Sequence, residues 1–528
     1  MSGRLVVVGD TLLDRDVEGV VSRLCPDSPA PVLDESACVD RPGGAGLAAL
    51  FAAGRGEFDV ALVTALADDA GGARLSSLLT AAGIAVYALP LAGATAEKVR
   101  LRNRGRVLLR HDRGGPPSLP GEPGDAVLEL LASASVIVVS DYGRGVARQP
   151  TLRAALADAT APVVWDPHPR GPAPVPGTCL ATPNEVEARE LTGAAPAGSR
   201  LAMATRAGQE LRRRWRCGAV AVTLGADGAL LCHAGSTPLV VPAPTVAQGD
   251  TCGAGDRFAV AAGTALADGA LVSEAVQQAV AEATAYVAQG GVAACFPPDP
   301  DRRVASDATG PATEAPVPAT GARDSSEDVP QPAGGGFRTT ADGAVRPGSV
   351  VHAPAGTVGG AAIGPRAAGA VVAEVRAAGG TVVATGGCFD LLHAGHVATL
   401  EAARRLGDCL VVCLNSDASV ARLKGPDRPL VPQADRSRLL AALSCVDAVV
   451  IFDEPTPHAV LSWLRPDIWV KGGDYGSGGG DGPDLPEAAI MHRWGGHTVV
   501  VPYLDGRSTS RMIDAARAGR ACRDTSRS

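Results

Sequence analysis

The 528-residue sequence predicts an α/β protein with two domains of unequal size. Short apolar segments alternate with helical patterns in two separate parts of the chain, 1–297 and 366–520. The residues between these parts contain almost no large apolar side chains. The total length also exceeds the roughly 100 to 200 residues of a typical domain. These observations favour two α/β domains joined by a linker.

The larger domain is expected over residues 1–297. Runs of four to six mostly apolar residues recur there, and helical patterns lie between them. Such runs are typical of strands buried on both faces of a mainly parallel sheet with crossover helices. The predicted strands include 5–8, 136–140, 162–165 and 219–224.

Residues 298–365 are rich in Pro, Gly, Ala, Ser and Thr and in acidic residues, as in 311–320. A compact domain seldom contains so long a segment without apolar residues, so a disordered linker is predicted. A flexible linker of about 70 residues spans on the order of 45 Å, which favours independent domains without obligatory channelling. Residues 521–528 are expected to form a disordered tail.

A smaller α/β domain is predicted over residues 366–520. Its expected strands are 381–385, 410–414, 448–452, 468–470 and 498–501. Its expected helices are 367–378, 397–406, 436–443 and 457–464. No repeat relates this part of the sequence to the first domain, so internal duplication is disfavoured.

Composition narrows the function classes. The formal net charge of −8 gives no general electrostatic reason to bind nucleic acid or an anionic membrane. No apolar run approaches the roughly 18 residues that span a bilayer, and the start of the chain leaves no room for a signal peptide. The twelve cysteines are scattered without metal-site spacing, which favours reduced thiols. A cytoplasmic enzyme is therefore expected.

The first motif with chemical meaning is GDTCGAGD at residues 249–256. Gly253, Ala254 and Gly255 have almost no side chain and precede a helical pattern, so backbone N–H groups can approach a phosphate closely. Asp256 can accept a proton from an attacking hydroxyl group. An ordinary capped turn has the same residue types, so this motif alone leaves both interpretations open.

Five further blocks accompany that motif: GDTLLD at 9–14, RPGGA at 41–45, SDYGRG at 140–145, TPNEVE at 182–187 and VTLGADG at 222–228. With these blocks in this order, residues 4–297 resemble the ribokinase or PfkB family of sugar kinases. The resemblance implies a ribokinase-like fold, phosphorylation of a sugar by ATP, and Mg²⁺ carried with the ATP rather than held at a protein metal site.

The resemblance also implies roles for individual residues. Asp256 would be the catalytic base, and Gly253, Ala254 and Gly255 would form the anion hole. The residues implied to contact the sugar are Asp14, Gly43, Gly44 and Lys98, and those implied to contact the nucleotide are Asn184, Glu187, Thr223, Gly225 and Gly228. Lys98 also fits an exposed basic residue on a strand. Leu47 stands where the family usually has Asn, which puts one sugar contact in doubt.

The second motif is GCFDLLHAGH at residues 387–396, between a predicted strand and a predicted helix. His393 and His396 can face one phosphate near the start of that helix. Two histidines at this spacing can also bind a metal, but no third ligand has suitable spacing. Imidazoles that donate to ATP phosphates would stabilise charge as pyrophosphate leaves.

This block is similar to the cytidylyltransferase-like nucleotidyltransferase superfamily, and DGRSTSRMI at 505–513 fits the second signature of that superfamily. The implied fold is a Rossmann-like HxGH domain. The residues implied to contact the nucleotide are Gly387, Phe389, Lys424, Lys471, Ser508, Thr509 and Ser510. Lys424 and Lys471 also fit ordinary surface lysines. Phe389 and Asp390 are expected to shape the turn rather than do chemistry.

The order of the domains resembles the family of bifunctional heptose 7-phosphate kinases and heptose 1-phosphate adenylyltransferases. That resemblance implies an ADP-heptose product, ATP and Mg²⁺, self-association, and a separate phosphatase acting between the two steps. Two alternatives stay open. Both reactions can act on another sugar phosphate, or the first domain can be a non-catalytic kinase-like module attached to a working nucleotidyltransferase.

Overall fold

The computed structural model describes residues 3–193, 199–233, 235, 237–295, 361–473 and 485–502. Most of the predicted linker, the 505–513 signature and the predicted tail lie outside these ranges. Residues 361–365, which composition places in the linker, form strand β14 (Ala362–Ile363) and the start of helix α10 (Pro365–Ala377). Strand β14 is only two residues long, so it leaves no hydrophobic pattern that composition could reveal.

The first domain contains the expected parallel sheet, in the order β13-β12-β11-β10-β9-β8-β1-β4-β5. Strand β12 runs antiparallel to both its neighbours. The strands are β1 (Arg4–Gly9), β4 (Asp59–Leu66), β5 (Ala85–Pro90), β8 (Val136–Ser140), β9 (Val163–Asp166), β10 (Leu180–Ala181), β11 (Ala219–Thr223), β12 (Ala229–Cys232) and β13 (Leu239–Val241). The four strands predicted from the sequence are confirmed.

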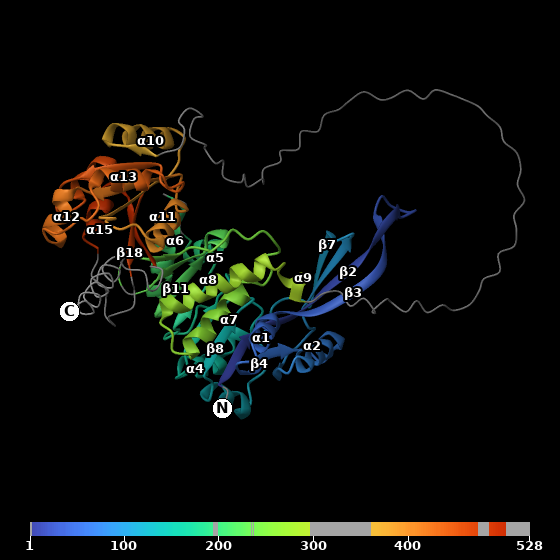
Figure 1. The fold of residues 1–528 in the computed structure, drawn as a ribbon. Helices are drawn as coiled ribbons and strands as arrows, with labels where there is room; N and C mark the ends of the chain where they lie inside the picture. The colour runs from blue at the N-terminus through green and yellow to red at the C-terminus, as the bar shows by residue number, and fades with distance from the viewer. Residues whose placement is uncertain are drawn as a thin grey trace, which may run out of the picture.

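Helices cover both faces of this sheet (Figure 1). Alternate residues of β1 and β8 point to opposite faces, so Val7 and Val138 pack in one apolar cluster and Val6 and Val139 in another. The helices of the first cluster are α1 (Ala45–Ala53), α7 (Ala254–Ala267) and α8 (Val272–Ala288), followed by α9 (Val292–Cys295). The other helices are α2 (Ala70–Ala81), α3 (Asp125–Ala132), α4 (Pro150–Ala157), α5 (Glu185–Thr192) and α6 (Arg200–Trp215), with short 3-10 turns η1 (Val146–Arg148) and η2 (Gly225–Asp227).

A second sheet of four strands projects from this domain, in the order β3-β2-β6-β7 (Figure 1). Its strands are β2 (Thr11–Leu24), β3 (Pro31–Gly44), β6 (Glu97–Asn103) and β7 (Arg106–Arg113). Strand β2 starts two residues after β1 ends, and β3 runs directly into α1. The base of the projecting sheet therefore lies at the carboxyl edge of the main sheet.

The second domain has a parallel sheet in the order β14-β17-β16-β15-β18-β19. Its longer strands are β15 (Val382–Gly387), β16 (Cys409–Asn415), β17 (Ala448–Phe452), β18 (Ile468–Gly473) and β19 (His497–Pro502). Its other helices are α11 (Ala394–Arg404), α12 (Asp417–Lys424), α13 (Gln433–Ala441), α14 (His458–Leu464) and α15 (Pro486–Met491), with the turn η3 (His492–Trp494). The strands and helices predicted for this domain are present.

The two domains share one sheet, because edge strand β19 of the second pairs in parallel with edge strand β13 of the first. Leu239 lies opposite Val500, and both side chains are buried. The prediction of independent domains is thus wrong for the described residues. The composition of the linker did not predict this contact, because the domains are joined by two apolar edge strands that lie far from the linker in the sequence.

Candidate active sites

Asp256 lies in the first turn of α7, and this helix begins directly after Gly253, whose φ of 80° suits a glycine. Its carboxylate is 3% exposed and accepts hydrogen bonds from Ser140 Oγ at 3.0 Å and Tyr142 Oη at 2.8 Å. Burial raises the pKa of Asp256 to about 6, although the two hydroxyl donors act to lower it. A carboxylate with such a pKa is suited to act as a general base near neutral pH.

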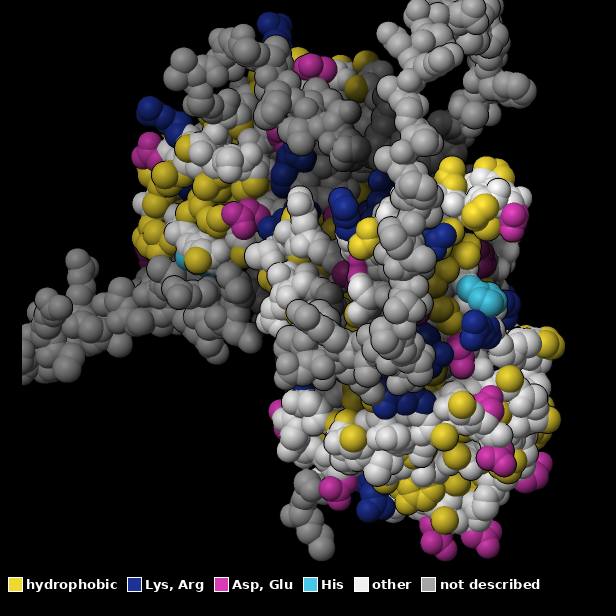
Figure 2. Space-filling view, turned by 90° about the vertical axis from the view of Figure 1, so that its right-hand side faces the viewer, with side chains coloured by type: hydrophobic (Ala, Val, Ile, Leu, Met, Phe, Trp, Pro, Cys, Tyr) yellow, Lys and Arg dark blue, Asp and Glu magenta, His cyan; other side chains and the backbone are white. Residues whose placement is uncertain are grey.

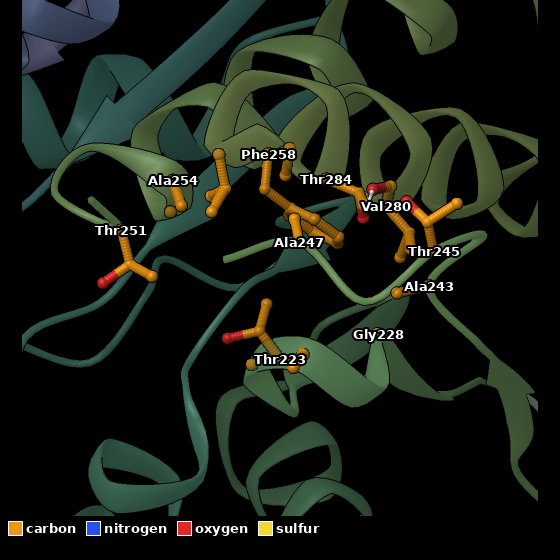
Figure 3. A pocket seen from close by; sticks show the side chains of 15 residues that line it. Thr223, Gly228, Ala243, Thr245, Ala247, Thr251, Ala254, Phe258, Val280 and Thr284 are labelled. Carbon is orange, nitrogen blue, oxygen red and sulfur yellow. Dashed lines mark hydrogen bonds between the residues drawn. The ribbon is translucent and has the colours of Figure 1, made fainter. Parts of the chain in front are cut away.

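A cavity of about 170 Å³ opens beside the start of α7 (Figure 3). It brings together the predicted nucleotide residues Thr223, Gly225 and Gly228 with Ala254 and Gly255 of the predicted anion hole. The rest of its lining is mainly small or apolar and was not predicted: Ala226, Ala243, Thr245, Ala247, Thr251, Phe258, Val280, Ala283, Thr284 and Val287. The shape and lining suit the flat, weakly polar base of a nucleotide with its phosphates toward α7.

Asn184 and Glu187 lie at the edge of this region, since Asn184 forms an isolated bridge with Thr223. Asn184 accepts hydrogen bonds from the N–H groups of Val186 and Glu187, and Glu187 accepts one from Asn184 N at 2.9 Å. These bonds cap helix α5. The capping holds the Glu187 carboxylate in a fixed place at the helix start.

Asp166, at the end of β9, was not singled out from the sequence. Its side chain is partly buried, and desolvation, followed by the charges of Glu187 and Asp256, raises its pKa well above the usual range. A bound cation would relieve this repulsion, and carboxylate oxygens suit Mg²⁺. Within the described ranges no three His, Cys, Asp or Glu side chains form a ready metal site, so Mg²⁺ would be held by Asp166 and Glu187 together with nucleotide phosphates.

On the other side of Asp256, Asp14 of β2 faces the end of β3. A Cβ atom on Gly43 would lie 2.5 Å from Asp14 Oδ2, so only glycine allows this approach. Gly44 has a φ of 60° and packs against the carbonyl of Asp10. Asp14 also accepts a hydrogen bond from Arg100 at 3.0 Å, which holds its carboxylate in place. The predicted sugar-contacting residues are therefore adjacent.

Lys98 lines a cavity of about 280 Å³ next to Tyr142, and burial lowers its pKa. Its ammonium lies 5.4 Å from the centre of the Tyr142 ring. Several basic side chains that the sequence did not single out line the same cavity: Arg110, Arg113, Arg144, His168 and Arg170. Lys98 itself is partly buried, and two acidic residues, Glu97 and Asp112, complete the charged lining. The cavity is suited to an anionic group that lies near the base Asp256.

Basic residues are otherwise dispersed on the face drawn in Figure 2, where Lys and Arg side chains alternate with acidic and hydrophobic ones.

Leu47 lies on α1 and is buried beneath the anion hole. A Cβ atom on Gly253 would come within 2.7 Å of Leu47 Cδ2, so the two residues are in close contact. Leu47 has no hydrogen-bonding group to offer a sugar. It packs the floor of the site instead.

In the second domain, His393 and His396 lie at the start of α11, and their rings stack with centroids 3.9 Å apart. Burial, then the nearby His393 and Lys424, lowers the pKa of His396 to about 4. His396 is therefore a neutral imidazole at neutral pH. A neutral imidazole can donate one N–H to a phosphate oxygen.

The turn before this pair is held by charged groups. Asp390 is buried and accepts from Leu430 N at 2.7 Å, Val431 N at 3.0 Å and the Arg428 guanidinium. Arg436, fully buried, donates to the carbonyls of Cys388, Asn415 and Val431 and to Asp417. The expectation that Asp390 shapes the turn is confirmed; the role of Arg436 was not predicted.

Gly387 and Phe389 form the same turn. Phe389 is buried with a φ of 45°, and its ring centre lies 5.2 Å from that of His396. A side chain on Gly387 would meet the Phe389 ring at 3.1 Å. Both residues position the histidine pair.

Lys424 ends α12 and is close enough to His396 to lower the pKa of that histidine. Lys471 lies on β18, near the carboxyl end of β15, and its Nζ is 2.6 Å from Glu487 Oε1. Glu487 on α15 is buried and was not predicted. Ser508, Thr509 and Ser510 lie outside the described residues.

Comparisons with known proteins follow the same division. Residues 2–299 match the family described as pfkB family carbohydrate kinase, and residues 384–480 match the cytidylyltransferase-like family. The Bifunctional protein HldE of Streptomyces coelicolor is 48% identical over 519 residues, 98% of this chain and 97% of that protein. The chain belongs to the HldE family of bifunctional proteins. A second HldE relative, from Halorhodospira halophila, is 36% identical over 98% of this chain and 97% of its own length.

Membership of the HldE family makes the chain a bifunctional enzyme with a kinase domain and a nucleotidyltransferase domain. Kinases and nucleotidyltransferases of these families use ATP, typically with Mg²⁺. Among solved structures, ribokinase from Arabidopsis thaliana complexed with ribose and ATP covers 56% of this chain and 96% of its own, with 22% identity and a TM-score of 0.44. The match to phosphofructokinase-2 from Escherichia coli in complex with potassium covers 55% of this chain and 94% of that protein, with 21% identity and a TM-score of 0.46.

Among the described helices, none has the length and apolar character needed to cross a bilayer.

Proposed function

We propose that this protein catalyses two steps of ADP-heptose synthesis, a phosphoryl transfer and an adenylyl transfer. The first domain transfers the γ-phosphoryl group of ATP to C1 of D-glycero-β-D-manno-heptose 7-phosphate, giving the 1,7-bisphosphate. The second transfers AMP from ATP to heptose 1-phosphate and releases pyrophosphate. One observation carries the proposal: a cavity lined by Lys98 and several arginines lies beside the proposed base Asp256. The same chain contains a nucleotidyltransferase domain.

In the kinase step, the C1 hydroxyl would give its proton to the Asp256 carboxylate as its oxygen attacks the γ-phosphorus. The bond from that phosphorus to the β,γ-bridging oxygen breaks, and ADP leaves. Ser140 and Tyr142 aim that carboxylate, and the N–H groups at the start of α7 stabilise charge on the transferring phosphoryl group. Mg²⁺ supplies further charge neutralisation between the phosphates when bound. The 7-phosphate fits the cavity lined by Lys98, Arg110 and Arg144.

In the adenylyl step, an oxygen of heptose 1-phosphate would attack the α-phosphorus of ATP, and the bond to pyrophosphate breaks. His393 and His396 donate to the phosphate oxygens as negative charge grows. Lys424 and Lys471 are the nearby cations for the leaving pyrophosphate. Ser508, Thr509 and Ser510 are proposed to hold the nucleotide phosphates.

The intermediate loses its 7-phosphate between the steps, so a separate phosphatase is the proposed pathway partner. We further propose a cytoplasmic homo-oligomer that binds neither nucleic acid nor membrane. Domain boundaries are proposed at 1–297 and 366–520, with the described fold of the second part beginning at β14.

Phosphorus NMR of the purified chain tests the proposal. With Mg–ATP and heptose 7-phosphate we expect a bisphosphate, and with heptose 1-phosphate in a separate tube we expect ADP-heptose and pyrophosphate. Product in neither tube would show that the sugar is wrong. Product in the second tube alone would favour a kinase-like module without chemistry.

A second candidate is the same pair of reactions on a different sugar phosphate. Leu47 favours it, because an apolar side chain packs beneath the anion hole where the family usually offers an amide. A panel of sugar 7-, 6- and 5-phosphates, compared by kcat/KM in the kinase reaction, separates the two candidates.

A further inference from the structure

The joint between the two domains adjoins the kinase's nucleotide cavity. Val500 N of β19 donates to Pro238 O at 3.1 Å, and Leu239 pairs with Val500. Leu239 and Val500 are 1% and 4% exposed, so the contact excludes water. A continuous apolar cluster also joins Val240 of the first domain to Val499 and Val501 of the second.

The chain that leaves β13 at this joint enters the cavity within two residues. Ala243, Thr245 and Ala247 all line it (Figure 3). Arg405, the residue that follows α11 in the second domain, donates from Nη1 to Ala243 O at 2.6 Å. A charged group of one domain therefore holds the backbone of the other domain's cavity wall.

The neighbouring turn 225–228, which also lines the cavity, depends on the same backbone. Gly228 has a φ of 96°, and a Cβ atom there would lie 2.1 Å from Val241 O and 2.7 Å from Ala243 N. Such close packing means that the 225–228 turn cannot keep its place if residues 241–243 shift. Two of the segments that line the cavity, 225–228 and 243–247, thus rest on the backbone that Arg405 and β19 contact.

We propose that the nucleotidyltransferase domain positions part of the lining of the kinase's ATP site, with Arg405 as the positioning residue. This rests on the assignment of the cavity to the kinase's nucleotide. Asp256, Ser140 and Tyr142 lie on other elements and make no contact with Arg405 among the hydrogen bonds of the described chain. Loss of Arg405 should therefore weaken ATP binding by the kinase without slowing its chemical step.

The test uses the full chain with Arg405→Ala, assayed for kinase activity over a range of ATP concentrations. A hydrogen bond from a charged donor is lost, so the KM for ATP should rise about three- to tenfold while kcat stays within about twofold. Arg405→Lys keeps a donor and should recover most of the loss. Adenylyl transfer by the same sample should be unchanged, which shows that α11 still folds.

Arg438→Ala is the matched control, since Arg438 lies in the last turn of α13 of the same domain and is exposed. It should leave both reactions unchanged. An unchanged KM in Arg405→Ala would overturn the inference. So would an equal rise in Arg438→Ala, or a fall in kcat alone.

Amide hydrogen exchange over residues 239–247, measured without substrate, tests the role of Arg405 independently of which sugar the kinase uses. Exchange there should be faster in Arg405→Ala than in the unaltered chain and in Arg438→Ala. If no heptose phosphate is turned over, the proposed substrate is wrong. The exchange result still shows whether Arg405 stabilises residues 239–247. Equal exchange in all three proteins would overturn the role of Arg405.

Discussion

Asp256 combines deep burial with two hydroxyl donors, and these have opposite effects on its charge. Burial favours the protonated acid, whereas Ser140 and Tyr142 favour the carboxylate. The resulting pKa of about 6 leaves a carboxylate that is ionised at neutral pH and basic enough to accept a proton. The proposed anion hole beside it consists of backbone N–H groups alone, so we expect kinase activity to depend on Asp256.

Replacing Asp256 with Asn should lower the kinase kcat by about 10²- to 10⁴-fold, because the amide cannot accept the proton. Adenylyl transfer by the same protein should be unchanged. Both rates are measured by separating nucleotides from sugar products chromatographically. Unaltered kinase flux in this variant would mean that Asp256 is not the base.

The kinase should also lose activity in acid. Below a pH of about 6 Asp256 is protonated and cannot accept the hydroxyl proton, so kcat/KM should fall about tenfold per pH unit there and level off above it. Initial rates between pH 4.5 and 8.5 give the profile. A profile with no inflection between pH 5 and 7 would contradict the assignment, provided that the substrate phosphates are titrated separately.

His396 should act as a neutral donor in adenylyl transfer. His396→Ala removes one donor to a developing charge, which is worth about 10²- to 10³-fold in kcat. His396→Asn retains an N–H donor and should be less damaged, which distinguishes hydrogen bonding from a charge effect. Pyrophosphate release reports the rate, and kinase activity serves as the control for folding.

At the scale of elements, several strands could be predicted closely. The bounds of β8 and β17 match the predicted 136–140 and 448–452, because uninterrupted apolar runs between polar residues define a strand buried on both faces. Helix α13 begins at Gln433, before the predicted 436, because its first turn is polar and partly exposed and so shows no apolar period. The projecting strands β2, β3, β6 and β7 were largely missed, since they mix charged and apolar residues.

The contact between β2 and β3 decides whether Asp14 can reach a sugar. Gly43→Ala would place a methyl group 2.5 Å from Asp14 Oδ2 and from Leu12 Cδ1, so the carboxylate must shift. We expect the KM for the sugar phosphate to rise about tenfold or more, with little change in the KM for ATP. Steady-state kinetics with each substrate varied in turn makes the comparison. Gly124→Ala is the matched control, because Gly124 has a φ of −77° and no atom lies within 4 Å of an added methyl group.

At the scale of the whole molecule, the joint of β13 with β19 makes one sheet and one apolar cluster from two domains. Unfolding of either domain would expose the cluster of the other. Differential scanning calorimetry should therefore show a single cooperative transition for the full chain. Val500→Asp introduces a charge into the joint and should split the transition in two. Two well-separated transitions in the unaltered chain would contradict the joint.

The sequence by itself determined the two α/β domains, their order and the residues of both phosphate motifs. These features are local: apolar periodicity, small residues before a helix, and histidines three positions apart can be found within short windows. Only the tertiary structure decided that Asp166 joins Asp256, that basic residues from distant segments surround Lys98, and that Arg405 contacts the kinase's cavity wall. Each of these depends on contacts between residues far apart in the chain, for which neither spacing nor composition gives a signal.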